Sequence, residues 1–387
     1  MEDKLNTKKV MVVFGTRPEA IKMAPVVHAL RKINLNCEVA VTAQHREMLD
    51  QVLNLFKIKP DYDLNLMQTG QTLSDITTRA LKGLEEVYNQ AKPDLVLVHG
   101  DTTTTFVAAL AAFYGQIPIG HVEAGLRTGN KYSPFPEEMN RKLTGALADL
   151  HFAPTLTSQK NLLAEGVSPE KIYVTGNTVI DALLATVKPD YVFEDPILKK
   201  VLEEGKDKRM VLVTTHRREN LGEPMRQIYR ALAEVLERFP DTYVIFPVHK
   251  NPSVRQVVQE VLGHNPRVFL IEPLDYEPFA NLMAKAHIVL TDSGGIQEEA
   301  PSLGIPVLVV RDTTERPEAV EARTVSLVGT SFAKVRDELS ILLEDQVVYN
   351  KMAQAVNPYG DGKSSVRIAK IIKDFFTEKL EKSNNSV

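Results

Sequence analysis

The chain has 387 residues, which is too long for one typical hydrophobic core, so two domains are expected. Its composition, 43% hydrophobic and 25% charged, is that of an ordinary globular protein, and the net charge of −4 argues against a nucleic-acid-binding surface. The single cysteine, Cys37, excludes an internal disulfide and a thiolate metal site; together with the lack of a membrane-length apolar run or a signal-peptide core, it predicts a cytoplasmic location.

In the first half of the chain, short β-rich apolar runs alternate with helical patterns. Strands are predicted at residues 8–15, 37–43, 94–100, 118–124 and 171–176, and helices at 20–33, 45–56 and 103–115. The pattern pauses over residues 188–208, which are charged, contain proline and leave room for one short helix. Such alternation is typical of a parallel sheet with helices on both faces.

The alternation restarts in the second half. Strands are predicted at residues 209–216, 242–249, 267–272, 287–295 and 306–312, with helices between them. The fold class is therefore α/β, with two Rossmann-like doubly wound domains at residues 1–188 and 189–365 and a C-terminal segment at 366–387. Ligands of such sheets bind outside the carboxyl ends of the strands, so we expect the site in a cleft that the two domains share.

Two basic residues follow the first predicted strand, in the segment "FGTRPEAIK". Arg17 and Lys22 lie in and just after the turn, where they would face the crevice, although a turn with solvated charges would have the same sequence. The turn has one glycine and no G-x-G-x-x-G, and that motif is absent from the rest of the chain, so no dinucleotide cofactor is expected.

Acidic residues follow two further strands and open a helix. Asp101 begins "DTTTT" after one strand, Glu123 follows the next strand in "HVEAGLR", and Glu137 and Glu138 open a helix in "PEEMNRK". Each alone could cap a helix or complement its dipole. Carboxylates aimed at one crevice push their pKa values apart, which provides a base and an acid at neutral pH.

His216, Arg217 and Arg218 end the first strand of the second half, in "TTHRREN". Arginine offers a planar fork to phosphate and histidine can carry a proton, so the segment suits a phosphate-bearing leaving group. The segment "RDTTERPEA" adds Arg311 and Arg316, which could equally form a capping box or mutual salt bridges.

The segment "TDSGGIQEEAPSLG" passes from a strand directly into a helix. Ser293, Gly294 and Gly295 would present backbone amides to a diphosphate. Glu299 would accept hydrogen bonds from the two hydroxyls of a ribose. Glu298, the next residue round the helix, is expected to point elsewhere, toward solvent.

Ten segments in chain order resemble the non-hydrolysing UDP-N-acetylglucosamine 2-epimerase family, over about residues 9–375. They include "FGTRPEAIKMAP", "LVHGDTTTT", "GHVEAGLRT", "YSPFPEEMNR", "HRRENLGEPM", "TDSGGIQEEAPSLG" and "NPYGDG". The resemblance implies a glycosyltransferase-B-like fold, a homodimer, and a C-terminal helix that packs back on the first domain. It implies reversible epimerisation of UDP-N-acetylglucosamine to UDP-N-acetylmannosamine for surface polysaccharide precursors, without a cofactor or a metal.

The resemblance also implies roles for individual residues. The catalytic residues would be Asp101, Glu123, Glu137 and His216: the acids would handle the proton on the two faces of C2, in an assignment that stays open, and His216 would stabilise the departing diphosphate. The substrate-binding residues would be Arg17, Lys22, Leu274, Phe279, Ser293, Gly294, Gly295, Glu299 and Arg316. A second nucleotide-sugar site, through which substrate activates the enzyme, would comprise Gln44, His45, Gln71, Glu138, Arg217 and His249.

Three other functions remain open from the sequence. A hydrolysing epimerase would release UDP and free N-acetylmannosamine, and analysis of the products would identify it. A glycosyltransferase with the same fold would need an acceptor groove. A non-catalytic nucleotide-sugar sensor would not need Asp101, Glu123, Glu137 and His216 together, so their joint presence weighs against it.

Overall fold

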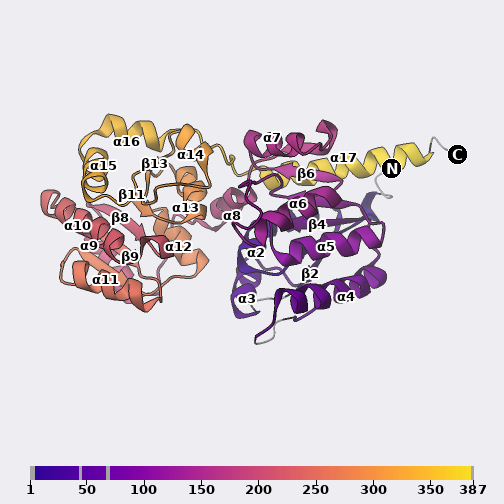
Figure 1. The fold of residues 1–387 in the computed structure, drawn as a ribbon, viewed down its shortest axis with the longest axis horizontal. Coiled ribbons are helices and arrows are strands. Elements are labelled where there is room, and N and C mark those ends of the chain that lie inside the picture. Colours follow the sequence, from indigo (N-terminus) through magenta and orange to yellow (C-terminus); the bar gives the residue numbers. More distant parts are fainter. Residues whose placement is uncertain (1–4, 43–45, 67–69, 385–387) are drawn as a thin grey trace. The chain divides into compact units, whose positions relative to one another are not determined.

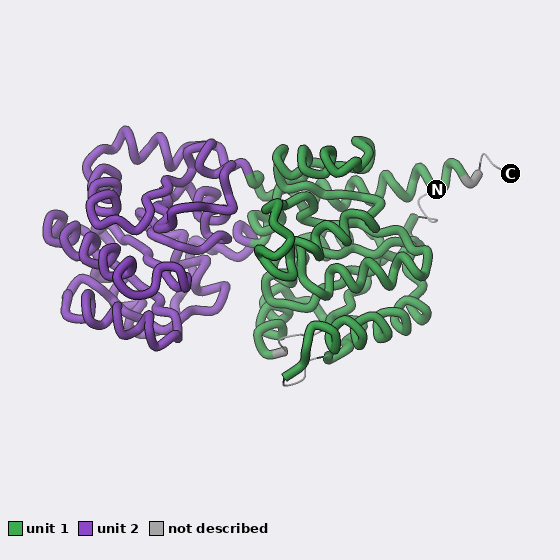
Figure 2. Tube along the Cα trace, viewed as in Figure 1, with its two compact units in different colours: residues 1–182, 359–387 green, residues 183–358 purple. Residues whose placement is uncertain are grey.

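The computed structural model describes residues 5–42, 46–66 and 70–384, and the chain forms two compact units. Unit 1 comprises residues 1–182 and 359–387, and unit 2 comprises residues 183–358 (Figure 2). The chain thus leaves unit 1 once and returns to it once. The domain limits predicted from the sequence, at residues 188 and 365, lie close to these two crossings.

Unit 1 contains, within the described residues, a seven-stranded parallel sheet of order β3-β2-β1-β4-β5-β6-β7 (Figure 1). Its strands are β1 (Lys9–Phe14), β2 (Asn36–Val41), β3 (Tyr62–Asp63), β4 (Leu95–His99), β5 (Ile119–Val122), β6 (Leu150–Ala153) and β7 (Ile172–Val174). Its helices are α2 (Arg17–Lys32), α3 (Arg46–Leu55), α4 (Leu73–Ala91), α5 (Thr103–Tyr114), α6 (Glu137–Leu147), α7 (Leu156–Ala164), the 3-10 turn η1 (Pro169–Lys171) and α17 (Ser364–Asn384). Because β1 pairs with both β2 and β4, the strand order reverses between β1 and β4.

Unit 2 contains, in the part of the chain that is described, a six-stranded parallel sheet of order β10-β9-β8-β11-β12-β13. Its strands are β8 (Arg209–Thr214), β9 (Thr242–Pro247), β10 (Val268–Ile271), β11 (Ile288–Thr291), β12 (Val307–Val309) and β13 (Val325–Leu327). Its helical elements are α9 (Pro196–Glu204), η2 (Arg218–Asn220), α10 (Glu223–Arg238), α11 (Pro252–Leu262), α12 (Tyr276–Met283), α13 (Gly294–Glu299), η3 (Ala300–Leu303), α14 (Pro317–Glu321), α15 (Phe332–Glu344) and α16 (Gln346–Ala353). The order reverses between β8 and β11, while α8 (Thr178–Thr186) leads from unit 1 into unit 2.

Each sheet is buried on both faces, which explains why its central strands are apolar throughout. All five residues of β4 are buried, and the side chains on one face of β1 and β4 pack against α4 and α5. In unit 2, β8 and β9 pack in the same way against α10 and α11. The predicted fold class, two doubly wound α/β domains, is confirmed.

Gly15, directly after β1, is fixed by a close approach of three elements. A Cβ atom at this position would lie 2.2 Å from Thr42 Oγ1 and 2.6 Å from Thr104 Oγ1. These two hydroxyls are themselves 2.8 Å apart and hydrogen-bonded. Only glycine leaves room for the turn that carries Arg17 to the reversal point of the sheet.

The return of the chain to unit 1 is anchored by Asp181. Its buried carboxylate accepts hydrogen bonds from the backbone amides of Ser364 (3.1 Å) and Ser365 (2.8 Å) and from the Ser365 hydroxyl (2.6 Å). A Cβ at Gly176 would lie 2.5 Å from Ser364 Oγ, and Gly176 has a positive φ of 88°. These contacts cap the start of α17, which packs along α2.

Of the helices in the described part of the chain, none combines the length and the apolar character that crossing a membrane requires.

Candidate active site

A buried glutamate that the sequence analysis did not single out organises the reversal point of unit 1. Glu19 Oε2 accepts hydrogen bonds from the Gly15 amide (3.1 Å), the Thr16 amide (2.8 Å) and the Thr16 hydroxyl (2.7 Å). Its Oε1 accepts from the Thr102 hydroxyl at 2.7 Å. Burial raises the pKa of Glu19, against the opposing effect of these hydrogen bonds. The residue therefore ties the turn after β1 to the start of α5, where Asp101 lies.

Glu123 is the most constrained of the predicted catalytic carboxylates. It follows β5 with a φ of 63°, a left-handed conformation that is uncommon for residues other than glycine, and it is buried. Its Oε1 accepts hydrogen bonds from Lys22 Nζ and, at 2.8 Å, from Asn177 Nδ2. Strained residues held by several partners cluster at functional sites. Lys22 and Glu123, predicted from separate motifs, are thus in direct contact.

Two neutral histidines lie near this carboxylate. His99 Nε2 lies 3.5 Å from Glu123 Oε2, and burial lowers the pKa of His99 to about 4. His121 Nε2 lies 2.7 Å from the Gly100 carbonyl oxygen, and burial lowers its pKa to about 3. Both rings are therefore neutral at pH 7, and Lys22 supplies the positive charge next to Glu123.

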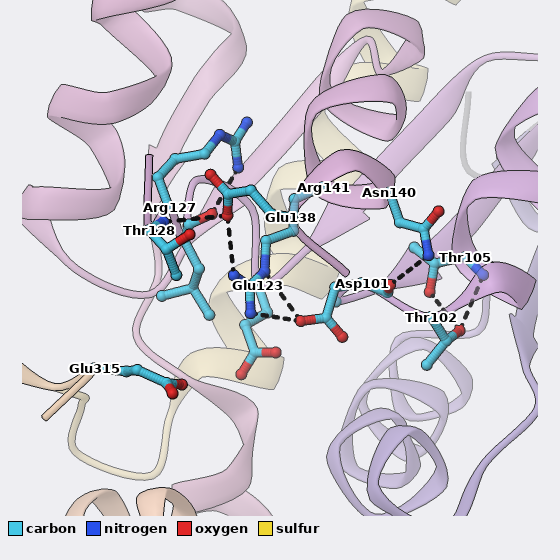
Figure 3. A network of polar contacts seen from close by, with 12 residues as sticks. Asp101, Thr102, Thr105, Glu123, Arg127, Thr128, Glu138, Asn140, Arg141 and Glu315 are labelled. Carbon is cyan, nitrogen blue, oxygen red and sulfur yellow. Dashed lines mark hydrogen bonds and ion pairs between the residues drawn. The ribbon is translucent and has the colours of Figure 1, made fainter. Parts of the chain in front are cut away.

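Arg141 joins two other acidic residues, as Figure 3 shows. Its Nε and Nη2 both donate to Asp101 Oδ2, at 3.0 and 2.7 Å, and its Nη1 donates to Glu138 Oε2 at 3.2 Å. Glu138 has no exposed surface, and it also accepts from the backbone amides of Thr128 and Gly129, each at 3.1 Å. The Asp101 side chain keeps 26% exposure, so it is oriented by Arg141 and still accessible.

Glu137 and Arg17 are both half-buried at the first position of a helix, α6 and α2 respectively. Within the described residues, neither side chain forms a hydrogen bond or an ion pair. Within these residues, the fold therefore does not pair either of the two charges. The substrate-binding role of Arg17 and the catalytic role of Glu137 therefore stay predictions.

The reversal point of unit 2 is built around Asp292, which is completely buried directly after β11. Its Oδ2 accepts hydrogen bonds from the backbone amides of His216 (2.9 Å) and Arg217 (2.8 Å) and from Asn220 Nδ2 (3.2 Å). Asn220 also donates to the Val310 carbonyl at 3.0 Å. Asp292 therefore fixes the turn after β8 to the ends of β11 and β12.

The imidazole of His216 lies between a carboxylate and a second histidine. Its Nδ1 is 3.3 Å from Asp292 Oδ1, and its ring stacks on that of His249 with centroids 5.4 Å apart and planes at 17°. Burial lowers the pKa of His216, and the Asp292 charge opposes this effect. The ring keeps 39% exposure, so it can reach a ligand.

The start of α13 is open on one side. A Cβ added to Gly294 would meet no atom within 4 Å, and one added to Gly295 would meet Glu299 Oε2 at 3.8 Å. Ser293 precedes them as the N-cap, with its amide bonded to Thr291 Oγ1. Glu299 Oε1 accepts from the Tyr276 hydroxyl at 3.3 Å, and burial raises the pKa of Tyr276 well above its usual value, so the phenol is the donor.

Glu298 does not point to solvent, and that prediction is wrong. Its side chain is buried and pairs with Arg316 Nε, which brings the loop after β12 onto α13. Gln297 strengthens the same junction by accepting a hydrogen bond from the Thr314 hydroxyl at 2.6 Å. Arg311 pairs with Glu219 at 2.8 Å, so it too is engaged in an ion pair within unit 2.

The remaining predicted residues lie in several places. Leu274, two residues before α12, and Phe279, within it, are both half-buried. Gln71 Oε1 accepts from Arg79 Nη2 at 2.6 Å. The predicted activator residues Gln44 and His45 lie outside the described residues.

Local sequence signals could have found some of the partners but not others. Glu19 stands three residues after Thr16, which is the capping-box spacing, and the structure shows that box. Asp292 stands directly before Ser293 and the two glycines that were selected from the sequence. Arg141 and Asn177 carry no such signal, because their partners Asp101 and Glu123 are tens of residues away in the chain.

Among the residues that the structure describes, no group of three histidine, cysteine or acidic side chains is placed to hold a metal ion.

Known proteins match the chain over nearly its whole length. The model of the family described as UDP-N-acetylglucosamine 2-epimerase matches residues 28–373. The UDP-N-acetylglucosamine 2-epimerase of Bacillus subtilis is 59% identical over 361 residues, which cover 93% of each chain. The crystal structure of UDP-GlcNAc 2-epimerase from Neisseria meningitidis bound to UDP-GlcNAc is 52% identical, covers 94% of this chain and 99% of that one, and has a TM-score of 0.82.

The fold is shared more widely. The glycosyltransferase of kitacinnamycin is only 13% identical, yet it covers 95% of this chain and 98% of its own with a TM-score of 0.64, which relates the two folds and nothing further. The family model and the relatives above 50% identity, with strand-end residues in the places that the motifs predicted, lead to one conclusion: the chain belongs to the UDP-N-acetylglucosamine 2-epimerase family.

Proposed function

We propose that the chain interconverts UDP-N-acetylglucosamine and UDP-N-acetylmannosamine, by eliminating UDP and adding it back to the other face of the sugar. Membership of the family supports the substrate, and the Neisseria relative was crystallised with UDP-GlcNAc. The observation that carries the proposal is Glu123, a buried carboxylate in a strained conformation between Lys22 and Asn177 at the carboxyl end of a strand in a doubly wound sheet.

The chemistry requires groups that move one proton. The C2 hydrogen of the sugar is not adjacent to a carbonyl, so it becomes acidic only as UDP leaves C1. In the elimination, the C1–O bond breaks and its electron pair stays on the diphosphate; the C2 proton passes to a carboxylate, and the C2–H electron pair forms the C1=C2 double bond. Re-addition with protonation from the opposite face inverts C2. Asp101, Glu123 and Glu137 are the candidates for the two faces.

Two arrangements suit Asp101 and Glu123 to this role. Arg141 grips one oxygen of Asp101 with two N–H groups, which fixes the direction of the carboxylate. Lys22 and Asn177 bind one oxygen of Glu123, which orients that carboxylate as well. Each carboxylate is thus held through one of its oxygens, which fixes its orientation. A group that removes one particular hydrogen atom needs such a fixed orientation.

In unit 2, His216 and the start of α13 would serve the nucleotide. His216 would give a proton to the diphosphate as it departs and take it back on re-addition. The amides of Ser293, Gly294 and Gly295 would hold the diphosphate, for which the open side of Gly294 leaves room. Glu299, oriented by Tyr276, would bind the ribose hydroxyls.

The non-hydrolysing outcome is supported by the ten motifs in chain order, and product analysis tests it. We expect UDP-N-acetylglucosamine to reach equilibrium with UDP-N-acetylmannosamine, followed by NMR of the anomeric and C2 protons. Accumulation of UDP and free N-acetylmannosamine until the substrate is exhausted would instead identify a hydrolysing enzyme. Unchanged substrate at high enzyme concentration would contradict catalysis altogether.

The proposal includes the setting of the enzyme. We infer a cytoplasmic homodimer that supplies surface polysaccharide precursors and is activated by its substrate at a second site that includes Gln71, Arg217 and His249. The stacking of His249 on His216 supports a link between that site and the nucleotide. Glu138 would act there through the loop at Thr128 and Gly129 that it holds, since its own side chain is buried.

A further inference from the structure

Asp292 contacts both the backbone amide and the imidazole ring of His216. Its carboxylate accepts the His216 amide with both oxygens, at 3.1 and 2.9 Å, and Oδ1 also lies 3.3 Å from His216 Nδ1. The residue is completely buried, and its other neighbours are the Arg217 amide and Asn220. Asp292 follows the last residue of β11 directly.

We propose that Asp292 is a positioning residue that keeps a proton on Nδ1 of His216 and so makes Nε2 the nitrogen that exchanges a proton with the leaving group. The leaving group is the UDP diphosphate of the proposed function, on which this part of the inference rests. The tautomer itself follows from unit 2 alone.

The physical reason is that an ionised carboxylate can only accept hydrogen bonds. If the ring proton were on Nε2, the lone pair of Nδ1 would face Oδ1 at 3.3 Å, and two acceptors would oppose each other beside a buried charge. With the proton on Nδ1, the same distance becomes favourable. The other titratable or charged groups near the ring are His249, which stacks on its face, and Arg217, and both oppose the charged form of the ring.

The proton balance of the reaction then has a defined path. His216 starts as an imidazolium, gives the Nε2 proton to the diphosphate oxygen whose bond to C1 breaks, and becomes the neutral Nδ1–H form. On re-addition, Nε2 takes the proton back as the C1–O bond forms again. The Nδ1 proton stays beside the Asp292 carboxylate throughout, so the ring keeps the same neutral tautomer in both half-reactions.

The first test reads the tautomer in the wild-type enzyme, without relying on activity. Protein labelled with ¹⁵N-histidine is studied by long-range ¹H–¹⁵N correlation at pH 8 to 9, and the His216 signals are assigned by their loss in His216→Gln. We expect the neutral ring to be protonated at Nδ1. A ring protonated at Nε2 would overturn the inference, even if the enzyme epimerises normally.

The second test compares variants at one carboxylate. Asp292→Asn should move the proton to Nε2, lower kcat by about 10²-fold or more with little change in KM, and shift the basic limb of the kcat profile to lower pH, because the charge that opposes desolvation is gone and His216 must be protonated to act as the acid. Asn220→Ala removes another hydrogen bond to the same carboxylate and should keep the Nδ1–H form. The inference fails if Asp292→Asn is folded and keeps the wild-type tautomer, or if both variants lose activity alike. If the wild-type enzyme showed no epimerisation, that result would contradict the proposed function and not the tautomer of His216.

Discussion

Glu123 has a strained backbone and a side chain that Lys22 and Asn177 hold in place. The two features together favour a functional role over a structural one. A structural acid at this position would not need a left-handed φ of 63°, since any cap or ion pair can be made from an ordinary conformation. Lys22 and Asn177 hold one oxygen, so the other is left facing the neutral ring of His99. The carboxylate is thus oriented without a protonated histidine beside it.

Removing the proton acceptor at this position should separate catalysis from binding. Glu123→Gln and Asp101→Asn keep the side-chain volume, so each should bind UDP nearly as the wild type does, while turnover falls by about 10²–10⁴-fold. Steady-state kinetics and calorimetry with UDP check this. Wild-type turnover, or a loss of UDP affinity in proportion to activity, would make these acids supports of the fold.

Glu299 provides a second residue-level prediction. Its carboxylate accepts a hydrogen bond from the Tyr276 hydroxyl at 3.3 Å, while its neighbour Glu298 pairs with Arg316. Glu299→Gln weakens acceptance from a ribose diol, so UDP affinity should fall by about 1–3 kcal/mol in calorimetry. Glu321→Gln, an exposed glutamate of the same unit, serves as the control. Equal UDP affinity in both variants would leave Glu299 with a structural role.

At the scale of elements, most strands and helices could be predicted from apolar runs and periodicity, and a few could not. The strands β1, β4, β8 and β9 and the helices α2 and α5 lie where the apolar patterns place them. The four-residue β6 and the three-residue β13 were missed, whereas β5 and β12 are as short and were predicted from the longer apolar runs that contain them. The helix α4 was missed although Thr72 and Asp75 form a capping box at its start.

The candidate site also contains residues that could be predicted from the sequence and residues that could not. Residues at strand ends, such as Asp101, Glu123 and His216, could be selected from the sequence because parallel strands bring their carboxyl ends together. Partners such as Arg141 and Asn177 could not, since Arg141 reaches Asp101 across 40 residues and Asn177 reaches Glu123 across 54. Long-range pairing depends on the strand order, which no local pattern contains.

The docking of α17 gives the prediction at this scale. Asp181 accepts three hydrogen bonds from Ser364 and Ser365. Asp181→Asn replaces one acceptor oxygen with an amide nitrogen that would face a buried donor, so it should destabilise the protein by about 1–3 kcal/mol. Urea denaturation gives the free energy, and hydrogen exchange should show faster exchange in α17. Asp374→Asn, on the exposed side of the same helix, should change stability by less than about 0.5 kcal/mol. Equal effects of the two substitutions would exclude a specific anchor.

For the whole molecule, buried neutral histidines predict sensitivity to acid. Burial lowers the pKa of His121 to about 3, whereas an unfolded chain binds the same proton near its usual value of 6.5. Above pH 6.5 neither state is protonated; between about 6.5 and 3 only the unfolded state is, so stability falls as the pH falls through this window. The slope is on the order of 1 kcal/mol per pH unit for this histidine.

Denaturation midpoints across pH 7 to 4 check this slope. His121→Gln should reduce it, whatever its effect on stability at pH 7, and the exposed His264→Gln should leave it unchanged. A slope that is equal in all three proteins would mean that His121 does not stay neutral in the folded state.

The central claim for the molecule is that epimerisation proceeds by loss and return of the C2 proton, with UDP leaving and re-adding. The most direct measurement is incubation with UDP-N-acetylglucosamine in deuterated water, followed by NMR at C2. We predict deuterium at C2 of UDP-N-acetylmannosamine and, because the reaction is reversible, also at C2 of the substrate recovered at equilibrium. Epimerised product without solvent deuterium would contradict proton transfer through the carboxylates and would indicate an internal hydride transfer instead.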